Sequence, residues 1–270
     1  MDCLNRREKY RDMDAEVIHH LQAFGSCAPF EKEYIRKDGS RIPVMLGCAM
    51  PSPEAGEGVA FMLDIRDRRQ AEMTQKILAE AGSILVSSLD YRTTLNSIAQ
   101  LLVPTLADLC FFDLILSDGS MQRVAPYHSD QEKAEWFTQI QEFAPIPNDA
   151  RHPVNQVLQS RKGQIDAIDA AWIRAIAQTP KHQHMIELCC LTTLITVPLI
   201  ARNRTLGALT LALTYDSHRT YTEKDLAIAE QLATRVSLAL DNSRLYQQAQ
   251  EANRIKDEFL AVLSHELRSP

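Results

Sequence analysis

The sequence predicts an α+β protein that contains more than one folded unit. Strand-like runs joined by Asp-Gly turns occur twice, within residues 30–65 and within residues 109–128. Other stretches show the three- and four-residue apolar spacing of helices, and residues 223–269 contain neither Gly nor Pro. A chain of 270 residues with 45% hydrophobic content can form more than one core.

Residues 1–69 form the first predicted region. A charged helical start leads to two strand-like runs around the Asp38-Gly39 turn, and a loop over 51–58 precedes a third run over 59–65. We expect a three-stranded antiparallel sheet with one helix. So small a unit buries little apolar surface, and we expect it to hold no ligand.

Residues 75–245 form the second predicted region, entered through a linker helix over 70–90. A helix is expected over 67–88, and Asp90 is the expected N-cap of a helix over 91–106. Strands over 109–117 and 121–128 flank the turn at Asp118-Gly119. Further helices are predicted over 131–143, 153–160 and 167–178, and two adjacent buried central strands over 191–199 and 206–214.

Residues 222–270 are predicted to form a long helix with Thr222 as the expected N-cap and Asp225 in its first turn. At 1.5 Å per residue such a helix would span on the order of 70 Å. An apolar seam runs along it, and a seam of this length needs a cover, so we expect a parallel homodimer with contacts over 222–265. The apolar repeat is interrupted over 246–252. A change in the helical winding at this interruption would transmit a signal along the helix; the alternative is that the helix is a passive spacer. The seam consists of Leu226, Ala229, Ala233, Val236, Leu240, Ala252, Ile255, Phe259 and Val262.

The end of this helix carries the clearest chemical signal in the chain. His265 lies off the apolar seam, where an imidazole can meet another domain, and Glu266 beside it can accept the proton that a ring nitrogen loses as a nucleophile. The simpler interpretation is an ordinary surface histidine. We favour the chemical interpretation because a whole run of residues fits one pattern.

That run, from Phe259 to Pro270, resembles the phosphoacceptor box of sensor histidine kinases. The resemblance implies that His265 accepts the γ-phosphate of ATP and passes it to an aspartate of a response regulator. It also implies that Glu266 is the polarising base and that Arg268 and Ser269 help to position partners. No Gly-rich ATP cradle is visible in the sequence. We therefore expect ATP and Mg²⁺ to bind to a kinase domain outside these residues, without which this chain is inactive.

The two sensory regions also resemble known families. The 36–41 run Arg-Lys-Asp-Gly-Ser-Arg, followed by Asp64-Ile65, resembles the closing strands of a PAS domain, whose opening strands have no counterpart here. Residues 75–245 resemble a GAF domain, through the runs 197–202, 206–211, 221–226 and 239–246. The GAF resemblance implies a small ligand between the sheet and its helices. The ligand stays open, because no cysteine precedes a histidine as in bilin attachment and a cyclic-nucleotide signature is largely missing.

One segment invites a metal interpretation, with five potential ligands in nine residues: His182, His184, Glu187, Cys189 and Cys190. Their spacing does not match structural zinc sites, so we expect no metal and no cofactor bound by this chain. The six cysteines form no Cys-x-x-Cys pair and suit free thiols in a reducing compartment.

Charge and hydrophobic patterning limit the kinds of partner and the cellular location that we expect for this chain. The formal charge of -6 and the lack of a basic run argue against nucleic acid. The longest uncharged stretch, 188–201, contains Pro198 and is too short to span a membrane, and the N-terminus lacks a secretory signal, so we expect a cytoplasmic protein. Two other functions stay open: a non-catalytic regulatory protein that binds a small ligand, and a dimerisation scaffold.

Overall fold

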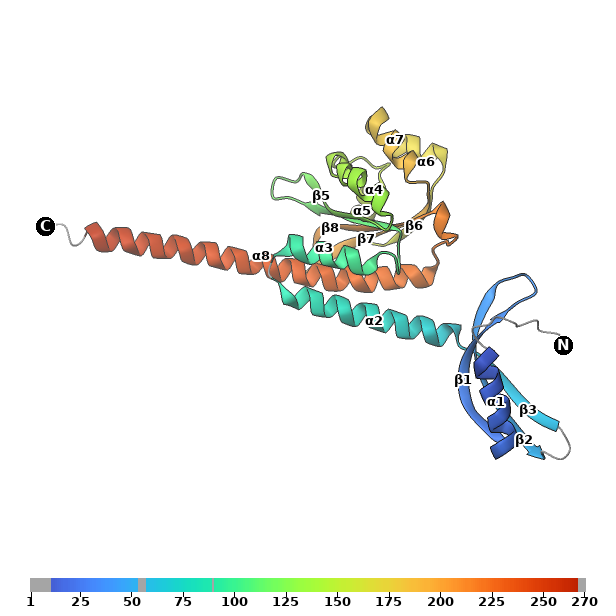
Figure 1. The fold of residues 1–270 in the computed structure, drawn as a ribbon. Helices are drawn as coiled ribbons and strands as arrows, with labels where there is room; N and C mark the ends of the chain where they lie inside the picture. Colours follow the sequence, from blue (N-terminus) through green and yellow to red (C-terminus); the bar gives the residue numbers. More distant parts are fainter. Residues whose placement is uncertain (1–10, 53–56, 89, 267–270) are drawn as a thin grey trace. The chain divides into compact units, whose positions relative to one another are not determined.

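The computed structural model describes residues 11–52, 57–88 and 90–266, and it divides the chain into two compact units at Gln75/Lys76. The first unit contains α1 (Arg11–Phe24), β1 (Ser26–Ile35), β2 (Arg41–Ser52) and β3 (Glu57–Asp64), followed by the start of α2 (Arg66–Ser87). Its strands form an antiparallel sheet in the order β1-β2-β3. The predicted three-stranded sheet is therefore confirmed (Figure 1).

Turn chemistry and one ion pair shape this small unit. The Asp38 carboxylate accepts hydrogen bonds from the Ser40 backbone N–H at 2.9 Å and from its hydroxyl, and Gly39 takes a φ of 82° that a Cβ would disfavour. Helix α1 contacts β1 and β2, and Asp14 on α1 pairs with the buried Lys32 of β1. Few side chains in this sheet are fully buried.

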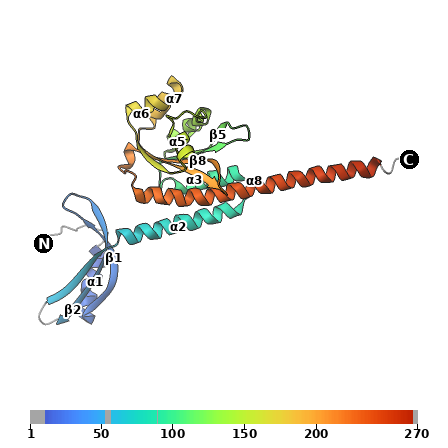
Figure 2. The same cartoon turned by 180° about the vertical axis from the view of Figure 1, so that it is seen from behind.

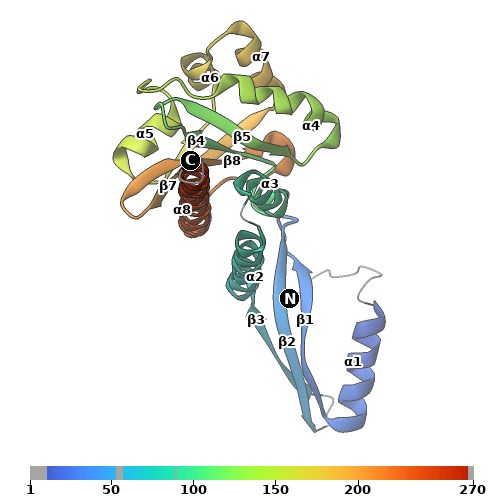
Figure 3. The same ribbon diagram turned by 90° about the vertical axis from the view of Figure 1, so that its left-hand side faces the viewer.

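The second unit is built on a five-stranded antiparallel sheet in the order β5-β4-β8-β7-β6 (Figures 1 and 3). Its strands are β4 (Leu109–Ile115), β5 (Met121–His128), β6 (Gln164–Ala167), β7 (Leu191–Ala201) and β8 (Arg204–Thr214). Its helices are the end of α2, α3 (Tyr91–Leu102), α4 (Gln131–Phe137), η3 (Thr138–Phe143), α5 (Pro153–Ser160), α6 (Ala170–Ile176), α7 (Pro180–Leu188), η4 (Tyr215–Ser217) and α8 (Glu223–Glu266). The α+β class, with two antiparallel sheets and a long C-terminal helix, is confirmed.

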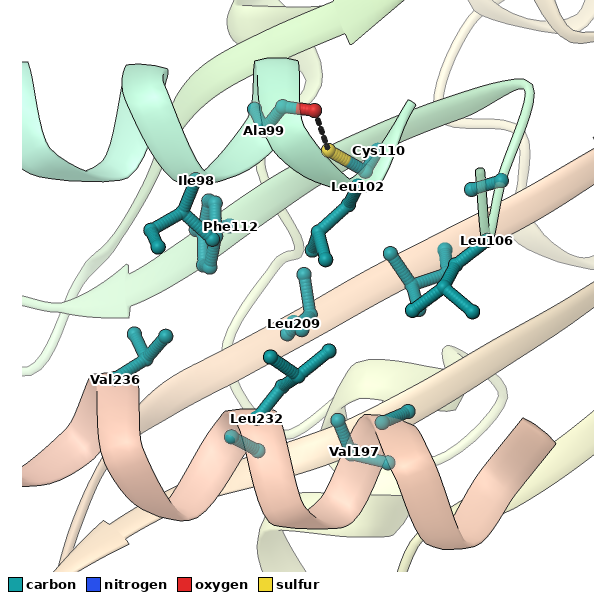
Figure 4. Close-up of a cluster of buried hydrophobic side chains, with 14 of the residues drawn as sticks. Ile98, Ala99, Leu102, Leu106, Cys110, Phe112, Val197, Leu209, Leu232 and Val236 are labelled. Atoms are coloured by element: carbon teal, nitrogen blue, oxygen red, sulfur yellow. Dashed lines mark hydrogen bonds between the residues drawn. The ribbon is translucent and has the colours of Figure 1, made fainter. Parts of the chain in front are cut away.

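Strand alternation gives this sheet two different cores. One face carries the side chains of Cys110, Phe112, Val197 and Leu209, which pack against α2, α3 and α8 (Figure 4). The opposite face carries Leu109, Leu194 and Ala212, which pack against α4, η3 and α7. Because successive residues of a strand point to opposite faces, each central strand contributes to both cores.

Most predicted local signals are found where the sequence placed them. The Asp90 side chain accepts the Arg92 backbone N–H at 3.1 Å at the start of α3, and the Thr222 N–H and hydroxyl both donate to Asp225 at the start of α8. Helix α3 ends at Leu102 and not near residue 106, because Pro104 disfavours a helical conformation for the residue before it.

One segment was predicted wrongly. In place of a single helix over 167–178, residues Gln164–Ala167 form β6 and residues Ala170–Ile176 form α6, with Asp169 as N-cap. Helix α7 (Pro180–Leu188) was not predicted, although Thr179 as N-cap and Pro180 in the first turn are recognisable start signals.

The apolar seam of α8 also needs a correction. Ala229, Ala233 and Val236 are at most 2% exposed, because they pack on the sheet inside the same chain. They are not free to face a partner chain, and Val236→Asp would disrupt this core. From Leu245 to Glu258 every residue of α8 is exposed, as the helix continues past the sheet (Figure 2). Among the described residues, no helix combines the length and apolarity needed to cross a membrane.

Candidate functional site

A cavity lies between the sheet of the second unit and its covering helices. The space inside it that is open to the centre of a water molecule is about 50 Å³, several times what one buried water needs. The sheet supplies Leu109, Phe111, Arg123, Leu191, Leu194, Thr196, Thr210 and Ala212, and the covering segments supply Phe137, Ile140, His152, Pro153, Val154, Trp172, Ile176, His182, Ile186 and Cys189. Most of this wall is apolar or aromatic.

Two threonines interrupt the apolar wall at the centre of the sheet. Thr196 of β7 and Thr210 of β8 are directly opposed in the antiparallel register. Their side chains share the cavity face with Leu194 and Ala212, because the intervening residues point to the α8 face. Both hydroxyl oxygens are buried and have no hydrogen-bond partner within the described part of the chain. Such orphaned polar atoms are uncommon in native interiors.

A buried ion pair contributes Arg123 to the wall of the cavity. Arg123 donates from Nε to Asp113 Oδ1 at 2.9 Å and from Nη2 to Oδ2 at 3.0 Å, and both side chains are at most 3% exposed. The guanidinium also lies 3.9 Å from the centre of the Phe111 ring. The planar fork of arginine matches a carboxylate in this two-point geometry, so the charge of Arg123 is already compensated within the protein.

Two buried histidines in the wall are held as neutral rings. His152 Nδ1 accepts the Val154 backbone N–H at 3.2 Å as the N-cap of α5, and His182 Nδ1 accepts the Gln178 N–H at 3.2 Å. Burial, reinforced by the nearby charge of Arg123, lowers the pKa of His152 to about 3 and the pKa of His182 to about 4. With Nδ1 occupied as an acceptor, the neutral ring carries its proton on Nε2 and offers it as a donor.

The five potential metal ligands of residues 182–190 do not come together in the structure. His182 and Cys189 are buried in the cavity wall, whereas His184, Glu187 and Cys190 are exposed. No group of three potential ligands gathers anywhere in the described residues. Burial raises the pKa of the Cys189 thiol to about 12, so this sulfur stays protonated at neutral pH.

A chain of polar contacts connects the cavity wall with α8. Arg161, at the C-terminal end of α5, donates to the side-chain and backbone oxygens of Asn203 at 2.7 and 3.1 Å. Arg202, beside Asn203 in the β7–β8 turn, lies 3.2 Å from Asp241 and 3.4 Å from the Asn242 side chain on α8. These contacts meet α8 at the point where its burial ends.

The predicted phosphoacceptor residues lie apart from the cavity. The backbone of His265 and Glu266 belongs to the last turn of α8. Arg268 and Ser269 lie outside the described residues, and the positions of the side chains from 259 onward are likewise not described. The structure therefore brings together the cavity residues, of which the sequence singled out only His182 and Cys189, as possible metal ligands.

The sequence held a weak signal for that cavity. Thr196 and Thr210 are polar residues inside two strongly apolar runs, and His152 precedes a proline that opens a helix. The GAF resemblance predicts a ligand between the sheet and its helices, but the sequence does not show which residues line that space, because strand pairing and helix packing bring them together.

Comparison with known proteins supports the identification of the second unit. The sequence profile of the GAF domain family matches residues 88–241, more than half of the chain. The hybrid signal transduction protein dokA of Dictyostelium discoideum is 37% identical over 62 residues, which cover 23% of this chain and only 4% of that protein.

Solved structures that are partly similar to this chain have low sequence identity to it. The free methionine-R-sulfoxide reductase of Neisseria meningitidis is 16% identical, with a TM-score of 0.48 over 66% of this chain and 93% of that one. The GAF domain of an Acinetobacter phosphoenolpyruvate-protein phosphotransferase is 14% identical, with a TM-score of 0.48 over 64% and 95%. The chromophore-binding domain of an R. palustris bacteriophytochrome is 14% identical, with a TM-score of 0.45 over 88% and 81%.

The lowered histidine pKa values predict an acid-sensitive fold. Below the ordinary histidine pKa of about 6.5, these two histidines are protonated in the unfolded chain but remain neutral in the folded chain. The free energy of unfolding therefore falls as the pH drops from 6.5 toward the lower pKa values of the folded state. His152→Asn keeps an acceptor at the N-cap but removes the titrating ring. We expect the variant to lose about 2 kcal/mol less of its unfolding free energy than the wild type between pH 6.5 and pH 5.

Urea unfolding at several pH values measures this difference. His184→Asn, at an exposed position, is the matched control and should keep the wild-type slope. An unchanged slope in His152→Asn would show that His152 is not held neutral by the fold.

Proposed function

Because this chain belongs to the GAF domain family, we propose that it is the sensory part of a two-component histidine kinase. In this proposal a small molecule in the cavity controls the phosphorylation of His265. The carrying observation is α8, a single helix of 44 residues that begins in the GAF core and reaches His265. The partial similarity to a signal transduction protein supports the same direction.

The proposed chemistry is phosphoryl transfer to a ring nitrogen. A nitrogen of His265 forms a bond to the γ-phosphorus of ATP, the bond from that phosphorus to the bridging oxygen breaks, and ADP leaves. Glu266 accepts the ring proton, and Arg268 and Ser269 help to position partners. A separate kinase domain would bind ATP and Mg²⁺, because the transfer needs positioned cations and donors. An aspartate of a response regulator then takes the phosphoryl group from the histidine.

The cavity and α8 occupy opposite faces of one sheet, so a signal must cross or go around it. Helix α5 lines the cavity with His152, Pro153 and Val154. A ligand that shifts α5 would move Arg161, the β7–β8 turn and then Asp241 on α8. We propose this route as the link between the cavity and the phosphoacceptor helix.

The exposed half of α8 supports a homodimer whose contact surface keeps Ala252, Ile255 and Phe259 of the expected seam but not its buried first half. Leu238, Leu245 and Ala252 recur every seven residues, are exposed in the structure, and continue in sequence to Phe259. Ile255, three residues after Ala252, is 55% exposed. A seven-residue apolar repeat is the pattern of a two-stranded coiled coil, so a second copy of α8 is the proposed cover.

The phosphorylation proposal predicts labelling that depends on His265. The chain fused after Pro270 to the ATP-binding core of a histidine kinase should take up an acid-labile label from γ-labelled ATP and Mg²⁺. His265→Gln should lower the label at least about a hundredfold, because the nucleophile is gone. His184→Gln is the control and should keep it.

The same chain without the kinase core should remain unlabelled. Label that persists in His265→Gln, or no label in the fused wild type, would contradict the proposal and favour a non-catalytic regulatory protein.

The proposed route to α8 predicts a local loss of order when Arg202 is removed. Arg202→Ala deletes the contacts with Asp241 and Asn242. Because Arg202 is 63% exposed, we expect its ion pair with the largely buried Asp241 to contribute on the order of 1 kcal/mol. Amide hydrogen exchange over 238–246 should therefore rise about two- to fivefold.

Arg204→Ala is the matched control for this measurement. Arg204 lies in the same hairpin, is exposed, and makes no side-chain hydrogen bond or ion pair within the described part of the chain. Equal exchange in both variants would exclude the route through the turn.

The proposed dimer predicts that an added carboxylate disrupts dimerisation at one position of α8 and has no effect at another. Leu245→Asp places a carboxylate in the apolar repeat and should shift the chain to a monomer in light scattering across a dilution series. Asn253→Asp adds the same charge at an exposed position outside the repeat and should leave the dimer intact. A wild-type chain that is monomeric at every concentration, or a dimer that Leu245→Asp does not affect, would refute this interface.

A further inference from the structure

The polar side chains in the described wall of the second unit's cavity are either neutral or ion-paired. Its one cation, Arg123, is matched by Asp113 in a two-point ion pair, and its two histidines are neutral. The walls therefore carry no uncompensated charge. A charged ligand would lose its hydration on entry without meeting an opposite charge, which is costly in an apolar surrounding.

The described cavity wall contains two buried hydroxyls without hydrogen-bond partners, and these two residues are directly opposed in the sheet. The opposed Thr196 and Thr210 on the floor formed by β7 and β8 have buried, unpartnered hydroxyls on the cavity face of the sheet. Two neighbouring hydroxyls can both donate to a single carbonyl oxygen, which has two lone pairs. Phe111, Phe137 and Trp172 supply aromatic surface for the rest of such a molecule.

We propose that this cavity selects an uncharged, mainly apolar small molecule, whose carbonyl oxygen accepts hydrogen bonds from Thr196 and Thr210. The inference rests on the proposed sensory function and names the class of signal. Selectivity arises because an apolar ligand leaves both hydroxyls unpaired, whereas an anion finds Arg123 already occupied. The thiol of Cys189 stays protonated and the binding is non-covalent.

Three probes of similar size and shape test the proposal by NMR titration of the whole chain. Acetophenone carries an uncharged carbonyl, ethylbenzene lacks the polar group, and benzoate is an anion. Acetophenone should bind about tenfold more tightly than ethylbenzene, because it alone pairs the two hydroxyls, and at least about tenfold more tightly than benzoate. Equal or tighter binding of benzoate, or binding of none of the three, would overturn the proposal.

Matched variants assign the preference to the named residues. Thr196→Val and Thr210→Val keep the shape of the side chain and remove the hydroxyl, so each should reduce the preference for acetophenone over ethylbenzene, and both together should abolish it. Asp113→Asn leaves the charge of Arg123 uncompensated and should shift the preference toward benzoate. If Asp113→Asn does not fold, the threonine variants still decide, and an unchanged preference in the double variant overturns the assignment.

The result of the probe titrations can be told apart from the result of the phosphorylation experiment. If acetophenone binds as predicted while labelling of the fused protein does not depend on His265, the ligand chemistry stands and the kinase proposal fails. If labelling depends on His265 but benzoate is the preferred probe, the kinase proposal stands and the ligand class is wrong.

Discussion

The alternation of side chains along β7 and β8 is the constraint on which the second unit depends. Each strand must satisfy two environments at once, because neighbouring residues such as Thr196 and Val197 point to opposite faces. One face packs against α2, α3 and α8 in a large hydrophobic core, and the other face is covered by shorter helices that leave a cavity. The sheet is thus both the floor of the cavity and the support of a long helix, so the cavity and α8 lie on opposite faces of one sheet.

The buried pair of Arg123 and Asp113 gives the cavity its electrostatic character. Two charges taken out of water cost several kcal/mol each, and only good geometry and further hydrogen bonds offset that cost. The two-point contact and the Phe111 ring provide such a setting here. The pair keeps a cation in the wall without making the cavity cationic, and its positive charge helps to hold His152 and His182 neutral.

Helix α8 changes environment along its length. Its first half is part of a hydrophobic core, and Tyr221 just before it donates a hydrogen bond to the Leu106 carbonyl oxygen at 3.1 Å. Its second half has only solvent-exposed residues up to Glu258, with ion pairs of Arg254 to Glu251 and Glu258 within the helix itself. Helix α8 therefore connects the hydrophobic core with a segment whose described side chains are exposed, as the proposed route from the cavity to His265 requires.

The sequence by itself determined the local structure of most elements. Asp90, the Asp118-Gly119 turn and the Thr222–Asp225 pair act on residues a few positions away, so their effect is visible in the order of the amino acids. It also determined the motif around His265, which is a matter of consecutive residues. The sequence could not decide which apolar face of α8 is covered, because Val236 and Leu238 look alike until the sheet buries the first and leaves the second 48% exposed.

The tertiary structure alone decided the cavity. His152 and His182, and likewise Thr196 and Thr210, become neighbours in one wall through strand pairing and the packing of short helices over the sheet. Charge compensation of Arg123 by Asp113 and the neutral state of the histidines also depend on burial, which is a property of the packed fold. Local patterns specify elements, whereas the chemistry of a binding site arises from contacts between residues far apart in the chain.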